Sequence, residues 1–353
     1  MKKILIVGGG RQGSLVAKDF LEDRCEVTIA DIKNPHIKGT TFVKLDAGGY
    51  KILNRPKENS YFFRPFDLVV NTLPGDISFP VTKSIAYAGV KCVDLSFTHE
   101  DIFELDDIAR EYGSIIVPDC GLAPGLPNLL VGEQLRKQAI KEIKIYVGGV
   151  ALNRDAPYGY VCSWSPVDLK TEYLRPAQII VDGKIVTRNP LAKPETIFLQ
   201  GDGTMEAFYS DGLRTLLKLK DRVPNISELT LRWPGHIKSI KELLNSDKDF
   251  VEEIVANCSS GADEVFLLVS IKGEYETIVY KMIAHAYREQ SAMSRTTAHT
   301  CYAIGKILLQ GLFTDKGIHP PEHLSFHSSD CLKFVESVLE KKGMRILEVS
   351  TIQ

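Results

Sequence analysis

The stretch KKILIVGGGRQGSLVAKDFLE, residues 2–22, decides the fold of the first part of the chain. A short apolar run leads into Gly8, Gly10 and Gly13, spaced as GxGxxG, and apolar residues then recur at helical intervals. In such a unit the first glycine permits a tight turn, the second lets the backbone approach a pyrophosphate, and the third lets the helix lie close to the strand. The stretch therefore predicts a dinucleotide-binding turn, to which we also assign Arg11 and Gln12.

The segment EVTIAD, residues 26–31, is the next predicted strand and ends in Asp31, close to the spacing of about 20 residues at which an acid accepts ribose hydroxyls. A carboxylate at this point repels a 2′-phosphate, so the sequence predicts NAD rather than NADP as the cofactor. Lys33 and Lys38 follow closely and are able to moderate this preference. A glycine turn in an unrelated α/β protein is the alternative, which the agreement of strand, helix and acid disfavours.

Strand-like and helix-like segments keep alternating up to residue 118 and predict an α/β fold with a doubly wound parallel sheet. The segments are FDLVVNTLP (66–74), a helix near 80–89, VKCVDLS (90–96), a helix over 100–112, and SIIVP (114–118). Ligands of such sheets bind beyond the carboxyl ends of the strands. We therefore expect further cofactor contacts at these ends from Asp46, Asn71, Thr72, Leu73 and Pro74. For Asp46, a solvated turn residue is an equal alternative.

Composition bounds the class of protein. A chain of 353 residues with 44% hydrophobic and 25% charged residues is typical of a soluble enzyme of two domains. A net charge of -2 and a pI near 6.5 give no reason to expect a nucleic acid partner, and no apolar run reaches the ~20 residues of a membrane span. The run ILIV is too short for a signal peptide, and seven cysteines without a CxxC pair indicate free thiols. We expect a cytoplasmic protein with a small-molecule partner.

Beyond Pro127 the pattern changes to strands and hairpins. Pro127 suits the first turn of a helix that links two domains, and QIIVDGKIVTR carries the hairpin signal Asp182-Gly183. A second hairpin is expected to turn at Lys272-Gly273, and C-terminal helices are expected over roughly 293–310 and 328–342. The sequence thus predicts a dinucleotide-binding domain over 1–125, an α+β substrate and dimerisation domain with a mixed sheet over 126–290, and C-terminal helices over 291–353 that pack on the first domain.

The loop DCGLAPG, residues 119–125, follows the last predicted parallel strand at the nicotinamide end of the crevice. Asp119 is our candidate for orienting or deprotonating a substrate amine, because hydride leaves readily only from a carbon that bears a neutral nitrogen. A carboxylate that caps the turn is an equal alternative. Cys120 has no required role in hydride transfer, and we expect it only to line the loop.

Several longer motifs carry a resemblance to a known family. They are GGGRQG (8–13), LDA (45–47), DCGLAPG (119–125), SWSPVDLKTEYLRPA (163–177), EAFYSDGLRTL (206–216), TLRWPGH (230–236) and MSRTTA (293–298). In this order they resemble the saccharopine dehydrogenase family, and the chain is most similar to its short, two-domain form. The resemblance implies a homodimeric, NAD-linked enzyme that oxidises the side-chain amine of L-lysine to an imine, which water hydrolyses to ammonia and the 6-semialdehyde; this product cyclises to piperideine-6-carboxylate. The segment YVGGVALNRDAP (146–157) departs from the saccharopine reductases of the family and argues against a substrate of that size.

A lysine substrate needs an arginine for its α-carboxylate and polar groups around its amines. We select the substrate-binding residues from the family-like motifs: Tyr173, Arg175, Tyr209, Arg214 and Thr297. For the arginines, surface salt bridges are the alternative. His236 is a second candidate for the catalytic base because histidine titrates near neutral pH, and a structural hydrogen bond is its alternative.

No metal is expected. His319, His323 and His327 are four residues apart, but two prolines break the turn between the first pair and no acid or thiol completes a ligand set. Two other functions remain open besides the amino acid dehydrogenase. One is a dehydrogenase that condenses an amine with a carbonyl acid, as relatives that make saccharopine or carboxynorspermidine do, and the other is an NAD-binding sensor without activity.

Overall fold

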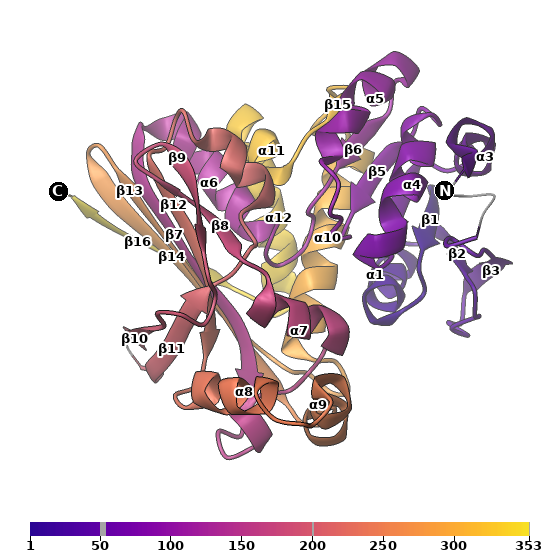
Figure 1. The fold of residues 1–353 in the computed structure, drawn as a ribbon. Helices are drawn as coiled ribbons and strands as arrows, with labels where there is room; N and C mark the ends of the chain where they lie inside the picture. Colours follow the sequence, from indigo (N-terminus) through magenta and orange to yellow (C-terminus); the bar gives the residue numbers. More distant parts are fainter. Residues whose placement is uncertain (50–53, 200, 353) are drawn as a thin grey trace. The chain divides into compact units, whose positions relative to one another are not determined.

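A computed structural model describes residues 1–49, 54–199 and 201–352 (Figure 1). The chain forms two compact units. Unit 1 combines Met1–Glu133 with Thr296–Lys342, and unit 2 combines Gln134–Arg295 with Gly343–Gln353. The chain passes from one unit to the other within helix α6 (Leu126–Lys137), which begins with the predicted Pro127 in its first turn.

Unit 1 is a parallel sheet with the strand order β15-β6-β5-β4-β1-β2-β3. Its strands are β1 (Lys3–Val7), β2 (Glu26–Asp31), β3 (Thr40–Lys44), β4 (Leu68–Asn71), β5 (Lys91–Asp94), β6 (Ile115–Val117) and β15 (Gly317–Ile318). Its helices are α1 (Arg11–Glu22), α3 (Pro56–Phe63), α4 (Gly75–Ala86), η1 (Ile102–Leu105), α5 (Asp106–Tyr112), α10 (Ala292–Gln310), α11 (Pro321–His327) and α12 (Ser329–Lys341). All strand pairs are parallel, so the predicted doubly wound sheet is confirmed.

Helices cover both faces of this sheet, which explains its continuous apolar strands. Residues Ile4 to Val7 of β1 are all fully buried. Helix α10 comes close to the sheet through Gly305, where an added Cβ would lie 3.0 Å from Leu68. Polar contacts join α10 to α1, since Asp19 pairs with His299 at 2.6 Å.

Unit 2 is a mixed sheet, as predicted, with the strand order β10-β11-β12-β7-β13-β14-β16 and the hairpin β8-β9 beside β12. Its strands are β7 (Ile140–Ala151), β8 (Ala177–Val181), β9 (Lys184–Arg188), β10 (Glu195–Leu199), β11 (Gly203–Tyr209), β12 (Asn225–Arg232), β13 (Asp263–Gly273), β14 (Glu276–His285) and β16 (Ile346–Ile352). Its helical segments are η2 (Pro157–Gly159), α7 (Pro166–Leu174), η3 (Arg214–Leu219), α8 (His236–Leu244) and α9 (Phe250–Cys258). Helices α7, α8 and α9 share one apolar core that includes Leu169, Ile240 and Ile254.

Both predicted hairpins of unit 2 are present, and the turn position is right in the first and wrong in the second, β13–β14. Asp182 and Gly183 join β8 to β9, both with positive φ, as a two-residue turn requires. Strand β13 instead continues through Gly273, and Lys272 pairs with Thr277. Gly273 serves a close approach, because an added Cβ would lie 1.8 Å from the Gln138 amide.

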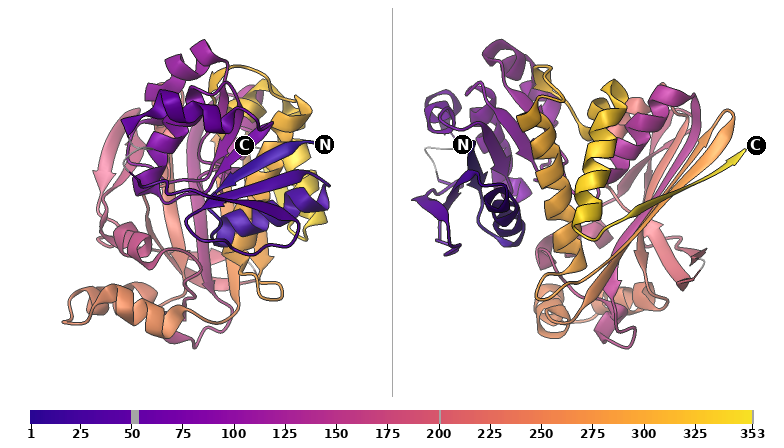
Figure 2. Two further views of the ribbon diagram at one scale, coloured as in Figure 1. Left: turned by 90° about the vertical axis from the view of Figure 1, so that its right-hand side faces the viewer. Right: turned by 180° about the vertical axis from the view of Figure 1, so that it is seen from behind.

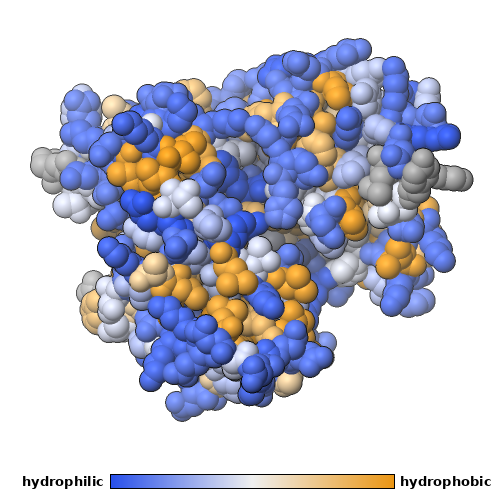
Figure 3. Space-filling model, viewed as in Figure 1, coloured by the Kyte–Doolittle hydropathy of each residue, from blue (hydrophilic) through white to orange (hydrophobic). Residues whose placement is uncertain are grey.

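The end of the chain adds an element that the sequence reading missed. Strand β16 pairs antiparallel with β14 and forms an edge of the unit 2 sheet, where it carries the C-terminus (Figure 2). Its Leu347 and Val349 are among the exposed large apolar residues. On the face of the protein shown in Figure 3, several separate apolar patches interrupt a mostly hydrophilic surface. None of the helices in the described ranges has both the length and the apolar character needed to cross a bilayer.

Candidate functional site

The glycine-rich turn between β1 and α1 has one glycine that the fold itself does not need. Gly8 has φ +98°, and an added Cβ at Gly13 would lie 1.9 Å from Gly8 O, so both positions exclude a side chain. Gly10 has φ -66°, and no heavy atom lies within 4 Å of the place its Cβ would take. This open space at the start of α1 is where a phosphate would approach the free NH groups, so the turn fits a pyridine dinucleotide.

These differences predict that two alanine variants differ in stability. Gly10→Ala should keep the unfolding temperature of the parent, because its methyl group meets no protein atom, and should lose at least about tenfold in dinucleotide affinity by occupying the phosphate space. Gly13→Ala should lower the unfolding temperature as well, because the backbone must move. Thermal unfolding and calorimetry with NAD check this, and a Gly10→Ala variant that binds NAD as the parent does would contradict the assignment.

Asp31 lies at the carboxyl end of β2, as the sequence predicts, with its carboxylate fixed by the backbone. Gly9 N donates to Oδ2 at 2.6 Å, and Lys33 N donates to Oδ1 at 2.9 Å. The carboxylate is therefore tied to the glycine turn. Arg11 and Gln12 are the first two residues of α1, the former exposed and the latter half-buried.

The ends of β4 and β5 are joined by a buried polar network. Asn71 Nδ2 donates to Ser78 Oγ at 2.7 Å and to Asp94 Oδ2 at 3.2 Å, and Thr82 Oγ1 donates to the same oxygen at 2.5 Å. Burial raises the pKa of Asp94 above its usual range, although these donors act against the rise. The Asn71 side chain is fully buried and shapes the strand ends; its predicted contact with a cofactor stays a prediction.

The other predicted cofactor residues lie around the same edge. Thr72 Oγ1 donates to Gly8 O at 2.7 Å and so links β4 to the glycine turn. Leu73 N donates to Asn71 Oδ1 at 3.3 Å, and Pro74 is the N-cap of α4. Asp46 is exposed in the turn after β3, where its carbonyl accepts from Gly49 N at 3.2 Å.

The loop after β6 holds Asp119 in an unusual backbone conformation. Asp119 has φ +56° and is 2% exposed, and an added Cβ at Gly125 would lie 2.8 Å from its carbonyl oxygen. The Ala123–Pro124 peptide is cis. Thr297 of α10 borders this loop, because a Cβ at Gly121 would lie 3.5 Å from its methyl carbon. Two predicted site residues, Asp119 and Thr297, thus belong to one small region of unit 1.

Cys120 follows Asp119 and is fully buried. Its thiol donates to Val117 O at 2.9 Å, and burial raises the pKa of the Cys120 thiol well above its ordinary value. A thiol that stays protonated and faces a backbone carbonyl packs the loop, which is the lining role expected of it.

In unit 2 the structure brings two predicted residues, Tyr173 and His236, into direct contact. Tyr173 Oη lies 2.8 Å from His236 Nε2, and His236 Nδ1 lies 2.7 Å from Tyr158 O. Since a carbonyl only accepts, Nδ1 carries the proton and Nε2 accepts from the tyrosine. Burial, followed by the nearby Arg232, lowers the pKa of His236 to about 3. Both nitrogens are engaged and the ring stays neutral, so these contacts give His236 the structural role that was the alternative to a catalytic base.

Strand β12 directs a row of polar side chains toward α7. Thr230 Oγ1 donates to Glu172 Oε1 at 2.8 Å, and Arg232 pairs with Glu172 Oε2 at 3.0 Å. The Arg232 guanidinium also lies over the Tyr160 ring, 4.8 Å from its centroid. Arg232 is only 3% exposed, so this ion pair holds α7 on the sheet.

Glu228 begins the same row and was not predicted as a site residue. It is 4% exposed, and Ser210 Oγ donates to its Oε1 at 3.1 Å. An added Cβ at Gly212 would lie 1.8 Å from that oxygen, so the carboxylate lies against the turn formed by residues 210–212. Burial raises the pKa of Glu228 to about 8. The signal in the sequence was a charged residue inside the alternating strand NISELTLR.

The remaining predicted substrate residues lie on or next to this turn. Arg175 Nε is 3.2 Å from Asp211 Oδ2, and both side chains are about one quarter exposed, at 27% and 26%. Tyr209 is the last residue of β11, and Arg214 begins η3 with φ +44°. Arg175 and Arg214 thus lie on or next to this turn, whereas Tyr209 pairs with Leu229 and packs on the core on the opposite face of the sheet from Glu228.

The raised pKa of Glu228 predicts a pH-dependent stability. In the unfolded chain the carboxyl titrates near 4.5, and in the folded protein near 8, so unfolding releases a proton between these values. The stabilising contribution of the protonated form is complete below about pH 4.5 and is lost as the pH rises through about 8. Relative to Glu228→Gln, the parent should lose on the order of 4 kcal/mol of unfolding free energy across this interval. Urea unfolding at pH 5 and pH 9 measures the difference, and parallel pH profiles for the two proteins would contradict it.

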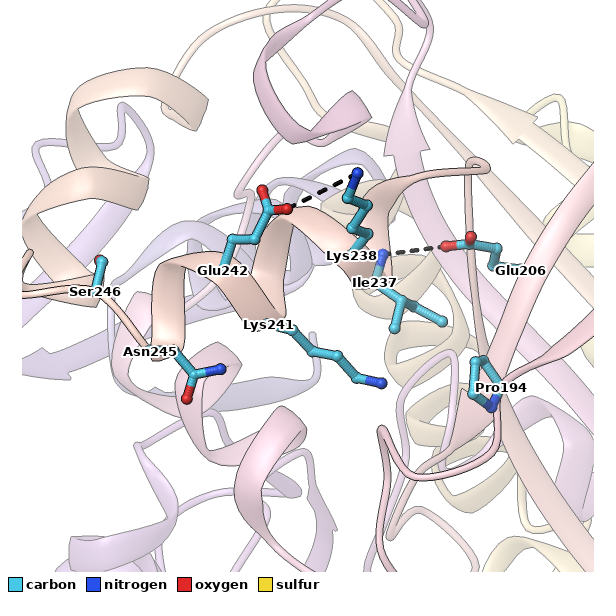
Figure 4. A pocket seen from close by; sticks show the side chains of 8 residues that line it. All are labelled: Pro194, Glu206, Ile237, Lys238, Lys241, Glu242, Asn245 and Ser246. Carbon is cyan, nitrogen blue, oxygen red and sulfur yellow. Dashed lines mark hydrogen bonds and ion pairs between the residues drawn. The ribbon is translucent and has the colours of Figure 1, made fainter.

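An open surface hollow of about 630 Å³ lies beside α8 in unit 2 (Figure 4). It is lined by Pro194, Glu206, Ile237, Lys238, Lys241, Glu242, Asn245 and Ser246. Glu206 accepts from Gly235 N at 3.0 Å and from Ile237 N at 3.1 Å, so its carboxylate caps the helix. The hollow contains none of the predicted catalytic or substrate-binding residues, and we assign it no substrate.

No metal centre was found in the described part of the chain, where no group of three or more His, Cys, Asp or Glu side chains is arranged around one point. His319 Nε2 lies 3.1 Å from Lys316 O, and its ring packs on Phe313. All seven cysteines are free thiols.

A parallel sheet with a glycine turn and an acid after β2 defines a pyridine-nucleotide-binding protein with a separate mixed-sheet unit. The family is shown by two family models that together cover most of the chain. The model described as saccharopine dehydrogenase NADP binding domain matches residues 4–117, and that described as saccharopine dehydrogenase C-terminal domain matches residues 121–344. The chain belongs to the saccharopine dehydrogenase family.

Curated relatives agree with this family. Saccharopine dehydrogenase [NADP(+), L-glutamate-forming] of Pyricularia oryzae is 26% identical over 275 residues, which cover 72% of this chain and 58% of the relative. The mitochondrial alpha-aminoadipic semialdehyde synthase of Bos taurus is 26% identical over 194 residues, which cover 52% of this chain and 21% of the relative. The chain thus matches about a fifth to three fifths of the length of these relatives.

The fold is also that of a solved family member. Apo saccharopine dehydrogenase (L-Glu forming) from Saccharomyces cerevisiae superimposes with a TM-score of 0.78 and 17% identity, and the match covers 99% of this chain and 100% of the other. At this identity the likeness establishes the fold and not the reaction.

Proposed function

We propose that the protein is an NAD-dependent lysine 6-dehydrogenase. It would oxidise the side-chain amine of L-lysine to an imine, which water hydrolyses to the 6-semialdehyde and ammonia, and the semialdehyde cyclises to piperideine-6-carboxylate. The observation that carries the proposal is the polar cluster of unit 2, in which Arg175 and the carboxylate of Glu228 are held at the turn of residues 210–212. An arginine beside a carboxylate that lacks a cationic partner matches an amino acid with an anionic and a cationic group.

The substrate must reach the reactive state as a free amine. Asp119 would take the proton from the side-chain ammonium, since its carboxylate lies in the loop that follows the carboxyl end of β6, where nicotinamide rings bind in folds of this kind. Loss of that proton frees the nitrogen lone pair, and the hydride then leaves the adjacent carbon. NAD, when bound, supplies the ring that accepts this hydride.

Positioning of the substrate would fall to the arginines. A guanidinium binds a carboxylate through two parallel hydrogen bonds, and Arg175 and Arg214 are the candidates on or next to the 210–212 turn. Arg175 also forms an ion pair with Asp211, whose Oδ2 lies 3.2 Å from its Nε. Arg232 is tied to Glu172 inside the aromatic core and is not assigned to the substrate.

A substrate screen tests this proposal. The protein should reduce NAD with L-lysine alone, seen as a rise in absorbance at the nicotinamide band, and Asp119→Asn should lower kcat by at least about a hundredfold with little change in NAD affinity. L-Ornithine and L-norleucine are the matched substrates, because one shortens the side chain and the other lacks its amine. Oxidation of NADH only with an amine plus a carbonyl acid would instead assign the condensing reaction, which the names of the saccharopine dehydrogenases favour. NAD binding without turnover in either direction would assign the sensor.

The cofactor preference rests on Asp31. Its carboxylate is held by Gly9 N and Lys33 N at the end of β2, where the ribose of the dinucleotide binds in this fold. We therefore propose NAD, although the matching domain is described as NADP-binding.

Neutralising this acid should change the preference. Asp31→Asn removes the charge that repels a 2′-phosphate and keeps the size of the side chain, so kcat/KM with NADP should rise at least about tenfold relative to NAD. Asp107→Asn, in the exposed first turn of α5, is the matched variant for loss of one negative charge in unit 1. A parent enzyme that already prefers NADP would disprove the assignment.

A further inference from the structure

Glu228 has a buried carboxylate whose surroundings leave one oxygen without a donor. Ser210 Oγ bonds to Oε1, and among the residues that the structure describes no hydrogen-bond donor reaches Oε2. No Lys, Arg or His side chain in those ranges forms an ion pair with it. A carboxylate that is 96% buried and lacks a cation is costly unless it keeps a proton or meets a positively charged ligand.

The charged side chains around Glu228 form two ion pairs. Asp211 and Arg175 form an ion pair beside the same turn, and Glu172 from α7 pairs with Arg232 at the other end of the row. Each arginine thus has its own carboxylate, and Glu228 is the acid left over. The two ion pairs are partly exposed, since the Arg175 side chain is 27% and the Glu172 side chain 19% exposed.

Neighbouring residues of the turn 210–212 contact Glu228 and Arg175 separately. Gly212 packs against the Glu228 carboxylate, and Asp211 next to it binds the Arg175 guanidinium. An α-amino acid carries its ammonium and its carboxylate on the same carbon, so its two receptors must also be neighbours. One acid and one arginine anchored to adjacent residues satisfy that condition.

We propose that Glu228 binds the α-ammonium group of the amino acid substrate, beside an arginine that binds its α-carboxylate. This assignment rests on the proposed function and adds to it the group that recognises the α-amine. Gly212 is part of the site, because only a residue without a side chain lets the carboxylate lie against the turn.

Three ligands that differ by single ammonium groups test the assignment. L-Lysine carries both ammonium groups, 6-aminohexanoate lacks the α-ammonium, and L-norleucine lacks the side-chain ammonium. Their affinities are measured by calorimetry in the presence of NADH, so that no oxidation takes place. Glu228→Gln should weaken L-lysine and L-norleucine by at least about tenfold and leave 6-aminohexanoate unchanged, because a hydrogen bond between charged groups is lost only where an α-ammonium is present.

Two further variants separate recognition from structure. Gly212→Ala keeps the charge and displaces the carboxylate, so it should show the same selective loss and serves if Glu228→Gln does not fold. Glu264→Gln is the matched control, because Glu264 lies on the other face of the same sheet. Glu264 pairs with Val150 of β7 and Glu228 pairs with Ile145 of β7, and side chains five residues apart on a strand point to opposite faces. The control should bind all three ligands as the parent does.

Several results would overturn the assignment: an equal loss for all three ligands, no loss for any of them, a loss confined to the two ligands with a side-chain ammonium, or no binding by the parent protein. Failure of the proposed function would give a different result from failure of the α-ammonium site. A parent that binds L-lysine with this dependence on Glu228 but forms no NADH would retain the α-ammonium site and exclude the dehydrogenase.

Discussion

Unit 1 depends on the contact between α1 and β1 at two glycines. An added Cβ would lie 1.9 Å from Gly8 O at Gly13, and 2.8 Å from Thr72 Oγ1 at Gly8. Because atoms repel steeply at such separations, only glycines let β1, α1 and the end of β4 meet at one point. Thr72 then bonds to the Gly8 carbonyl, and Gly9 N bonds to Asp31. The same close approach that fixes these three strand ends leaves the space above Gly10 open for a phosphate.

Unit 2 depends in a similar way on the polar row of β12. Arg232 is buried among aromatic rings and its charge is balanced by Glu172, so removing Glu172 would leave an uncompensated charge at a cost of about 3–5 kcal/mol. This pair fixes α7, which ends at Leu174 with Arg175 as its C-cap. His236 locks Tyr173 of the same helix through its neutral ring. The interior of the unit thus positions an arginine at its partly exposed end.

Local rules were enough to predict the elements whose residues have a single physical explanation. The glycine spacing, the alternation up to Val117 and the Asp182-Gly183 turn all follow from backbone sterics and periodicity, and the structure has each of them. Elements set by distant contacts were not predictable in this way. Gly273 is a glycine because of Gln138 rather than a turn, and β16 exists because β14 offers an edge.

The sequence indicated which types of residue the candidate site contains, but it was a poorer guide to the role of each residue. Histidine is a residue type that commonly acts as a base, but the pKa of His236 depends on its burial and on Arg232. Neither can be read from the local sequence PGH, residues 234–236. Glu228 appeared to be an ordinary strand residue, because its isolation from cations is a property of the packed turn. Four carboxylates show what decides the outcome. Asp31 and Glu172 each receive two donors, and Asp94 is buried among several neutral donors. Glu228 has one neutral donor and no cation, so of the four it gains most from a positively charged ligand, and binding such a ligand would favour its ionised form.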